Sequence, residues 1–275
     1  MSTLAGRTVF ITGGSRGIGR AIALACAREG ANIVIAAKTD TPHPKLPGTI
    51  HTVAEEVEAA GGQALALVLD VRDEDAVKAR IDEAGAHFGG IDALVNNAGA
   101  IQLQGVEQLS VKRYDLMHQV NARAVFNCSQ AALPWLKKSA QAHILSLSPP
   151  LNLAPKWFAQ YGAYTTTKYA MTMLTLGMAE EFKRYGIAVN ALWPKTLIST
   201  AAIEHGIGGA AMMAQGRKPE IMADAAVAIL NRTQETLTGQ TLIDEDMLRQ
   251  DGVTDFEGYR YAAGDKPLLP DLFLD

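Results

Sequence analysis

Short apolar runs rich in β-branched residues alternate along the chain with longer segments of helical periodicity. The runs predict strands at Thr8–Thr12, Asn32–Ala36, Gln63–Leu69, Ile91–Val95, His143–Ser148, Ile187–Leu192 and near Gln240–Ile243. Helical patterns lie between them, the first two at about Gly17–Glu29 and Thr49–Ala60. Apolar strands separated by helices are typical of parallel sheets covered on both faces. We therefore predict an α/β fold, a doubly wound parallel sheet of about seven strands in a single domain over residues 1–275.

Three stretches break this rhythm. Asp40–Gly48 contains three prolines and is expected to be a stiff loop between a strand and a helix. Residues 196–218 are rich in Gly, Ala and Met, which favours a mobile, apolar substrate lid over a disordered segment. The C-terminal tail, residues 245–275, is too apolar to be free in solvent. We expect it to pack on its own domain or to cover a neighbouring subunit.

The composition limits the classes of function. The chain has 275 residues, of which 48% are hydrophobic and 20% charged, and a net charge of −4. That charge gives no basic field for nucleic acid and no polybasic membrane address. The N-terminus lacks the layout of a secretory signal and there is no apolar run of about 18 residues, so we predict no membrane span and a cytoplasmic location. Cys26 and Cys128 are expected to be reduced core thiols, and no metal site is predicted.

A glycine-rich loop follows the first predicted strand, where Thr12–Gly19 reads TGGSRGIG. Glycines allow a tight turn and a close approach of the backbone, and a helix N-terminus offers free N–H groups to phosphate oxygens. Because the motif follows a strand and opens a helix in an alternating chain, it predicts a Rossmann-type dinucleotide site. Within the loop, the predicted contacts to the dinucleotide are Gly13, Ser15, Arg16, Gly17, Ile18 and Gly19.

The residues after the second predicted strand favour NADP(H) over NAD(H). An NAD enzyme normally places an acidic residue about 20 residues past the glycines, on the ribose hydroxyls. This strand ends instead in Ala36-Ala37-Lys38, and Lys38 and Arg16 can both face a 2′-phosphate. NAD(H) remains possible because Asp40 could turn back to the ribose. That residue comes late, however, next to the proline-rich loop.

Two more strand ends bring polar residues to the same edge of the sheet. Asp70 and Val71 follow the third predicted strand, which places a carboxylate near the adenine. Asn97, Ala98 and Gly99 follow the fourth, at the carboxyl edge where ligands bind in open α/β folds. Such a turn by itself only ends a strand. Next to a glycine loop, these residues are expected to contact the cofactor.

A tyrosine and a lysine have the spacing that acid–base chemistry needs. Tyr164 and Lys168 lie four residues apart in a helical pattern and therefore share a face. A phenol with an ordinary pKa of about 10 is a poor proton donor or acceptor at neutral pH. A fixed cation beside it favours the phenolate and brings its pKa into working range. With the glycine loop, the pair indicates a hydride-transfer enzyme.

The order of these motifs resembles that of the short-chain dehydrogenase/reductase family along nearly the whole chain. The matching positions are Thr12–Gly19, Asp70, Asn96–Gly99, Asn121, Tyr164, Lys168, Asn190 and Pro194. Further stretches narrow the resemblance to one subgroup, and they are Ala37–Ile50, Ser148–Leu153, Gly177–Phe182, Asn190–Thr196 and Lys266–Asp275. We expect the sterol-carrier domain that some relatives add to be absent.

The resemblance implies a role for each matched residue. Tyr164 is expected to donate a proton to a carbonyl in reduction and to accept one from an alcohol in oxidation. Lys168 is expected to lower the pKa of Tyr164 and to bind the nicotinamide ribose, and Asn121 to hold a water that links Lys168 to solvent. Asn97 and Ala98 would line the nicotinamide. The family often pairs through the helices around 121–138 and 163–185, which implies a homo-oligomer, a dimer or tetramer.

The chain departs from the family pattern at the catalytic serine. The family places this serine about 13 positions before the tyrosine, where this chain has Leu151. Ser148 is the nearest hydroxyl, and strand alternation puts it on the same face as Ser146 and nearer the cleft. We predict that Ser148 is the catalytic serine, re-aimed by the Pro149–Pro150 bend. Asn152, or no equivalent at all, are the alternatives.

A second departure follows the sixth predicted strand. The family commonly has Pro-Gly there, whereas this chain has Pro194-Lys195-Thr196. Pro194 and Thr196 are expected to contact the cofactor, and Ser199 is an alternative partner for its carboxamide. Lys195 points to solvent or adds a cation near the cofactor.

These observations predict an NADP(H)-dependent oxidoreductase that acts on a carbonyl or alcohol of an apolar substrate. The resemblance suggests a steroid-like or fatty-acyl-derived compound. A nucleotide-binding redox sensor or a lipid-binding protein with little turnover is the alternative. The displaced serine favours that alternative, and the intact Tyr164, Lys168 and Asn121 oppose it.

Overall fold

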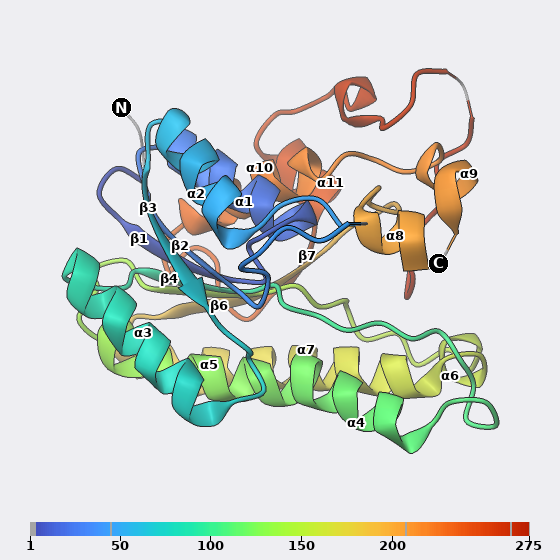
Figure 1. Ribbon diagram of the computed structural model, residues 1–275, viewed down its shortest axis with the longest axis horizontal. Coiled ribbons are helices and arrows are strands. Elements are labelled where there is room, and N and C mark those ends of the chain that lie inside the picture. The colour runs from blue at the N-terminus through green and yellow to red at the C-terminus, as the bar shows by residue number, and fades with distance from the viewer. Residues whose placement is uncertain (1–3, 45, 207, 265, 275) are drawn as a thin grey trace.

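Seven strands form one parallel sheet in the order β3-β2-β1-β4-β5-β6-β7 (Figure 1). The computed structural model describes residues 4–44, 46–206, 208–264 and 266–274. The strands are β1 Thr8–Thr12, β2 Asn32–Ala37, β3 Gln63–Val68, β4 Ala93–Asn96, β5 His143–Ser146, β6 Ala188–Trp193 and β7 Thr241–Ile243. The predicted fold class is confirmed: this is a doubly wound, Rossmann-type sheet.

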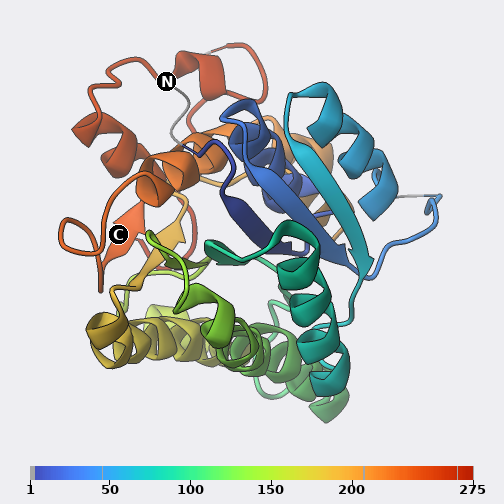
Figure 2. The same cartoon turned by 90° about the vertical axis from the view of Figure 1, so that its left-hand side faces the viewer.

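Helices cover both faces of the sheet, as Figures 1 and 2 show. One side has α1 Gly17–Arg28, α2 Ile50–Ala59, α10 Glu220–Leu230 and α11 Asp244–Gln250. The other has α3 Glu74–Phe88, α4 Val111–His118, α5 Ala124–Leu136 and α7 Gly162–Phe182. The central strands β1, β2, β4, β5 and β6 are buried along their whole length. Two apolar clusters, one under each helix layer, make up most of the core.

The strand order reverses between β1 and β4, and this reversal sets the position of the site. β1 pairs in parallel with β2 on one side and with β4 on the other. The loops after β1 and β4 therefore diverge to opposite faces of the sheet and leave a crevice at its carboxyl edge.

None of the helices in the described ranges is both long and apolar enough to cross a membrane. Cys26 and Cys128 are buried free thiols.

The segment predicted to be a lid contains two short helices, α8 Ala201–Gly206 and α9 Gly209–Met213. Of the two alternatives given for the tail, the structure shows the first, in which the tail packs on its own chain. It begins within α11 (Figure 1). Phe256 and Phe273 of the tail are buried. Residue 207 of the lid and residues 265 and 275 of the tail lie outside the described residues.

The remaining elements are short. They are α6 Lys156–Ala159, a π-helical turn at Gln119–Arg123 between α4 and α5, and 3-10 turns at Lys183–Tyr185 and Glu257–Tyr259.

Candidate active site

The glycine loop after β1 forms a cradle that side chains would fill. Gly13 and Gly17 have φ angles of 67° and 55°, in the left-handed region that favours glycine. A Cβ at Gly19 would lie 2.4 Å from Asn97 Nδ2 and 2.5 Å from the Gly13 oxygen. Asn97 Nδ2 donates to the carbonyls of Thr12 at 2.8 Å and Gly13 at 3.0 Å, which ties the loop to the end of β4. The loop presents backbone to the crevice, and this fits the pyrophosphate of a dinucleotide.

A cavity of about 560 Å³ extends from this loop along the carboxyl edge of the sheet. Most of the residues predicted to bind the cofactor line it, namely Gly13, Ser15, Arg16, Gly17, Ile18, Lys38, Asp70, Val71, Asn97, Ala98 and Gly99. Gly19 lies below the loop, packed against Asn97. Arg72 also lines the cavity and was not predicted. The separate strand-end motifs therefore meet at one nucleotide-sized crevice, which we call the nucleotide cleft.

Three cations and one carboxylate set the charge of the nucleotide cleft. Lys38 Nζ lies 3.2 Å from Asp70 Oδ2, and Arg72 Nη2 lies 2.6 Å from the same oxygen. Hydrogen bonds from Arg72 hold the pKa of the Asp70 carboxyl well below its usual range. Arg16 donates to Thr39 Oγ1 at 3.0 Å and braces the loop after β2. The cleft therefore has an excess of positive charge.

Asp40, the residue that left NAD(H) possible, lies outside the lining of the cleft. Its carboxylate is 2.6 Å from His51 Nε2, on the exposed surface at the start of α2. Turning toward the ribose would require Asp40 to give up this contact.

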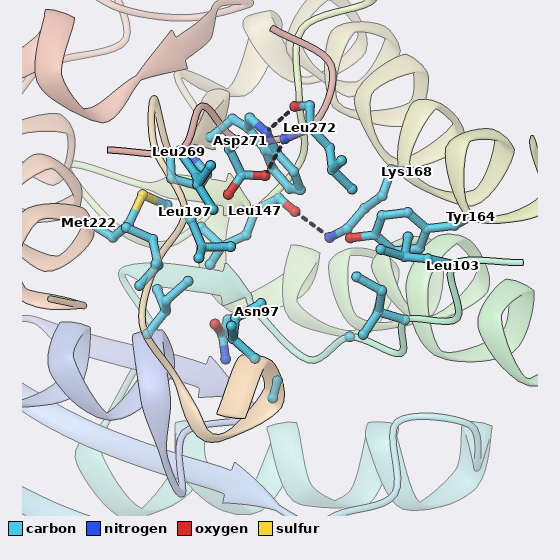
Figure 3. A pocket seen from close by; sticks show the side chains of 18 of the residues that line it. Asn97, Leu103, Leu147, Tyr164, Lys168, Leu197, Met222, Leu269, Asp271 and Leu272 are labelled. Atoms are coloured by element: carbon cyan, nitrogen blue, oxygen red, sulfur yellow. Dashed lines mark hydrogen bonds between the residues drawn. The ribbon is translucent and has the colours of Figure 1, made fainter. Parts of the chain in front are cut away.

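Tyr164 and Lys168 both come from α7 and are buried. Lys168 Nζ donates to the Leu147 carbonyl at 2.7 Å and lies 5.2 Å from the centre of the Trp193 ring. Figure 3 shows the ammonium and the phenol on the same side of the cavity, as the four-residue spacing predicts. The helix thus presents the two groups together at the end of β5.

Burial is the largest influence on the pKa values of the Tyr164 and Lys168 side chains. It raises the pKa of the Tyr164 phenol far above its ordinary value. It also lowers the pKa of the Lys168 ammonium to about 8. The loss of solvent and the nearby Asp271 carboxylate both act to raise the pKa of Tyr164. The lowering of that pKa by Lys168 stays a prediction. The phenol is held protonated, which is the form that donates to a carbonyl.

A second cavity, of about 420 Å³, opens beside this pair, and we call it the reaction cavity. It shares Ile18, Asn97 and Gly99 with the nucleotide cleft, so the two are continuous. Apolar side chains make up most of its wall, among them Leu103, Leu147, Trp193, Leu197, Ile203, Met212, Leu269 and Leu272. Leu197, Ile203 and Met212 belong to the predicted lid, and Leu269 and Leu272 to the tail. A pocket of this size and polarity suits a small apolar ligand.

Comparison with known proteins decides the family. A family model described as short chain dehydrogenase matches residues 7–205. The chain belongs to the short-chain dehydrogenase family.

The narrower resemblance is to hydroxysteroid dehydrogenase-like protein 2. The Xenopus laevis protein is 57% identical over 99% of this chain, which spans 64% of that relative's length. A short chain dehydrogenase from Mycobacterium thermoresistibile is 49% identical, with a TM-score of 0.93 over 99% of this chain and 96% of that one. A metagenomic short-chain oxidoreductase solved in complex with NADP is 25% identical, with a TM-score of 0.73 over 88% and 97%.

Asn121, which the sequence comparison matched to the family's asparagine, lies in the π-helical turn and is fully buried. Its Nδ2 donates to the Ala100 carbonyl and to Thr167 Oγ1, each at 2.9 Å, and its Oδ1 accepts from the Ala100 N–H at 2.8 Å. The side chain thus joins the loop after β4 to α7, and it makes no direct hydrogen bond to Lys168 among those described. Its part in a proton path remains a prediction.

The prediction that Ser148 faces the cleft as the short-chain dehydrogenase serine is wrong. Leu147 lines the reaction cavity, whereas Ser148 is fully buried and does not. β5 ends at Ser146, and the Ser148 N–H turns back to the Ser146 carbonyl at 3.0 Å. Strand alternation therefore stops before it can aim Ser148. Within the described residues, Ser148 Oγ has no hydrogen-bond partner.

The alternative residue, Asn152, is used for structure. Its Nδ2 donates to the Phe273 carbonyl at 3.2 Å, and Tyr169 Oη donates to its carbonyl at 2.6 Å. Asn152 therefore links the loop after β5 to the tail.

The residues after β6 divide between the cavity and an ion-pair cluster. Pro194 lines the reaction cavity, whereas Thr196 is buried and does not. Lys195 agrees with the first alternative, because its side chain is 44% exposed, and its Nζ lies 3.0 Å from Glu245 Oε1. Ser199 Oγ donates to the Met213 carbonyl at 2.8 Å and so braces the lid.

Proposed function

We propose that the protein is an NADP(H)-dependent oxidoreductase that moves a hydride between the nicotinamide and a carbonyl or alcohol of an apolar substrate. The observation that carries the proposal is the Tyr164–Lys168 pair in the wall of the apolar reaction cavity, which is continuous with the nucleotide cleft. The test is a panel of apolar aldehydes and ketones, including benzaldehyde, acetophenone and 2-octanone, with NADPH oxidation as the readout.

The residues supply the acid–base half of the reaction. When bound, the nicotinamide supplies the hydride, so that carbonyl, NADPH and one proton give alcohol and NADP+. Tyr164 gives its phenolic proton to the carbonyl oxygen and is protonated again from solvent. Lys168 stabilises the phenolate formed in that step, and Asn121 is proposed to hold a water on the path to solvent.

The charges of the nucleotide cleft support a preference for NADP(H). Lys38 and Arg72 lie beside Asp70 in the nucleotide cleft, outside the lining of the reaction cavity, and Arg16 also lines the cleft. A 2′-phosphate is attracted by this excess of cations, whereas Asp40 is already engaged with His51. We therefore propose that NADPH binds more tightly than NADH.

Lys38→Ala tests this preference. Loss of one charged contact is expected to weaken NADPH binding by roughly 10-fold to 100-fold and to leave NADH binding within about threefold. Titration followed by nicotinamide fluorescence measures both affinities, and Lys78→Ala, a change of an exposed lysine on α3, serves as the control. A tenfold preference for NADH in the unmodified protein would sink the cofactor assignment.

The substrate class follows from the walls of the reaction cavity. Leu, Ile, Met and Trp side chains dominate them, so a neutral, apolar carbonyl compound fits best. The name of the relatives suggests a steroid, and fatty-acyl-derived carbonyls of similar polarity belong to the same proposal. The second candidate, a sensor or lipid-binding protein, is favoured by the buried Ser148. It predicts NADPH binding with no turnover of any carbonyl in the panel. The cytoplasmic location also stays a prediction.

We also propose that two copies pair through α5 and α7. Phe126 and Met173 are 49% and 56% exposed and lie in one apolar groove formed by these helices. Exposed aromatic and Met side chains gathered in this way are typical of an interface.

Met173→Asp tests the pairing. A buried charge in the interface is expected to lower the molar mass in light scattering to that of one chain. Val106→Asp, at a more exposed position in a loop, is expected to leave the mass unchanged. A single-chain mass in the unmodified protein would contradict the pairing.

A further inference from the structure

The reaction cavity contains one polar group that the proposed chemistry does not use. Of the lining residues that the structure describes, those with a charged, amide or hydroxyl side chain are Asn97, Tyr164, Lys168 and Asp271. Asn97 is bonded to the glycine loop, and Tyr164 and Lys168 form the acid–base pair. Asp271 comes from the tail, far from the other three in sequence. Figure 3 shows its carboxyl on the tail side of the cavity, with Tyr164 and Lys168 entering from α7.

Two hydrogen bonds, at Asp271 and at the next residue, hold this part of the tail in place. The Asp271 N–H donates to the Lys195 carbonyl at 3.1 Å. Trp193 Nε1 donates to the Leu272 carbonyl at 2.9 Å. These contacts fasten the segment to the end of β6, beside the reaction cavity.

Phe273 anchors the segment from the other side. Its ring is buried and stacked on Tyr164, with centroids 6.1 Å apart and planes at 27°. Its φ of 73° lies in the left-handed region, which a bulky residue adopts only when its surroundings require it. This part of the tail therefore forms a fixed part of the cavity wall.

The Asp271 carboxyl is suited to donate a hydrogen bond near neutral pH. Its Oδ1 accepts the Leu272 N–H at 2.7 Å, and no described side chain donates to the carboxyl. Burial raises its pKa to about 7, against the effects of that bond and of the Lys168 charge. A carboxylic acid kept neutral by an apolar site has an O–H to offer to a substrate oxygen.

The titratable groups that act on Asp271 come from two elements. Tyr164 and Lys168 of α7 and Asp244 at the start of α11 interact with it electrostatically. Lys195 contributes only its backbone, because its ammonium is turned to Glu245. The nearest cation is therefore Lys168, and Asp244 adds a like charge that favours the protonated acid.

We propose that Asp271 is a catalytic residue of this site, whose protonated carboxyl donates a hydrogen bond to the substrate oxygen beside Tyr164. It takes the place for which a serine was predicted and which Ser148 cannot fill. The inference rests on the proposed carbonyl reduction.

Two substitutions separate this role from a structural one. Asp271→Ala removes the donor and is expected to lower kcat/KM for the fastest ketone of the panel by on the order of 10². Asp271→Asn keeps a donor that does not titrate, so it is expected to lower kcat/KM by less than about tenfold. The reduction rate of the unmodified enzyme is expected to fall as the pH rises through about 7, where the acid loses its proton. This fall is absent in Asp271→Asn. Asp246→Asn, on exposed α11 surface outside the cavity, is the control.

Two measurements do not depend on turnover. NADPH affinity is expected to stay within about threefold in all variants, because Asp271 contacts the substrate and not the cofactor. The infrared carbonyl stretch of carbonyl-labelled acetophenone, bound with NADP+, is expected to lie at lower frequency in the unmodified protein and in Asp271→Asn than in Asp271→Ala.

The outcomes are distinguishable. Undiminished kcat/KM in Asp271→Ala overturns the inference and leaves the proposed reduction standing. A loss of NADPH affinity in proportion to the loss of rate also overturns the inference, because it would make Asp271 a cofactor contact. A fall in rate above pH 7 that persists in Asp271→Asn also overturns it. An absence of turnover with every carbonyl in the panel overturns the proposed function, and the inference with it.

Discussion

Replacing Tyr164 with phenylalanine is expected to lower carbonyl turnover by roughly 10²-fold to 10⁴-fold and to leave NADPH affinity nearly unchanged. The phenolic proton is the one that the carbonyl oxygen receives, and no other hydroxyl of the described residues lines the reaction cavity. Phenylalanine keeps the ring that packs on Phe273, with centroids 6.1 Å apart, so the cavity wall is expected to survive. Initial rates of NADPH oxidation measure the loss.

Tyr169→Phe is the matched control for this change. Tyr169 is a buried tyrosine on the same helix and also packs against Phe273, but it does not line the reaction cavity. Its hydroxyl donates to the Asn152 carbonyl at 2.6 Å, so its loss is expected to cost about 1 kcal/mol of stability. Turnover should change little in this control. If Tyr164→Phe kept more than a tenth of the rate, the assigned role would be refuted.

The second large effect is expected at Glu245, where the tail begins. Its carboxylate, 7% exposed, meets Arg217 Nη1 at 2.5 Å, Arg249 Nη2 at 2.8 Å and Lys195 Nζ at 3.0 Å. Arg217 is itself only 8% exposed. Glu245→Gln removes the charge and leaves the Arg217 guanidinium buried without its counter-ion. We expect the free energy of unfolding at neutral pH to fall by about 3–5 kcal/mol, measured by urea denaturation.

The pH dependence of this effect has a definite sign. Burial acts to raise the pKa of the Glu245 carboxyl, but hydrogen bonds from Arg249, Arg217 and Lys195 outweigh it and lower the pKa to about 2. The stabilisation is therefore complete above pH 4.5, the ordinary value, and is lost as the pH falls toward 2. The difference between the unmodified protein and the variant should shrink over the same range. Glu257→Gln, at an exposed pair with Arg260, should change stability by less than about 1 kcal/mol. An equal loss at both positions would contradict the prediction.

Local patterns were enough for the sheet and for the nucleotide cleft. β1 has the predicted bounds, and the other strands agree to within two residues at each end. This agreement arises because parallel strands buried on both faces must be apolar throughout, which is visible without an alignment. Lys38, Asp70 and Asn97 come together in the nucleotide cleft for a related reason. Each lies within two residues of the end of a strand, and all parallel strands end at the same edge.

Whether the sequence could place a side chain in the site depended on whether that side chain lies inside a helix or strand or beyond its end. Tyr164 and Lys168 both lie within α7, so their helical spacing fixed their common face. Ser148 lies two residues past the end of β5, where the chain turns back on itself. The alternation of side chains between the two faces of a strand no longer applies there. The predicted strand extended two residues too far, and this error was enough to assign the wrong side chain to the cavity.

The sequence by itself determined the Rossmann-type sheet, the glycine cradle and the tyrosine–lysine pair, because each depends on residues within one element or at its end. Only the tertiary structure decided that the tail closes the reaction cavity, that Asp271 faces it and that Lys195 turns to Glu245. Phe273 and Tyr164 stack although they are far apart in the chain. Contacts of that kind leave no periodic signal in a single sequence, since they are set by how separate elements pack around a shared cavity.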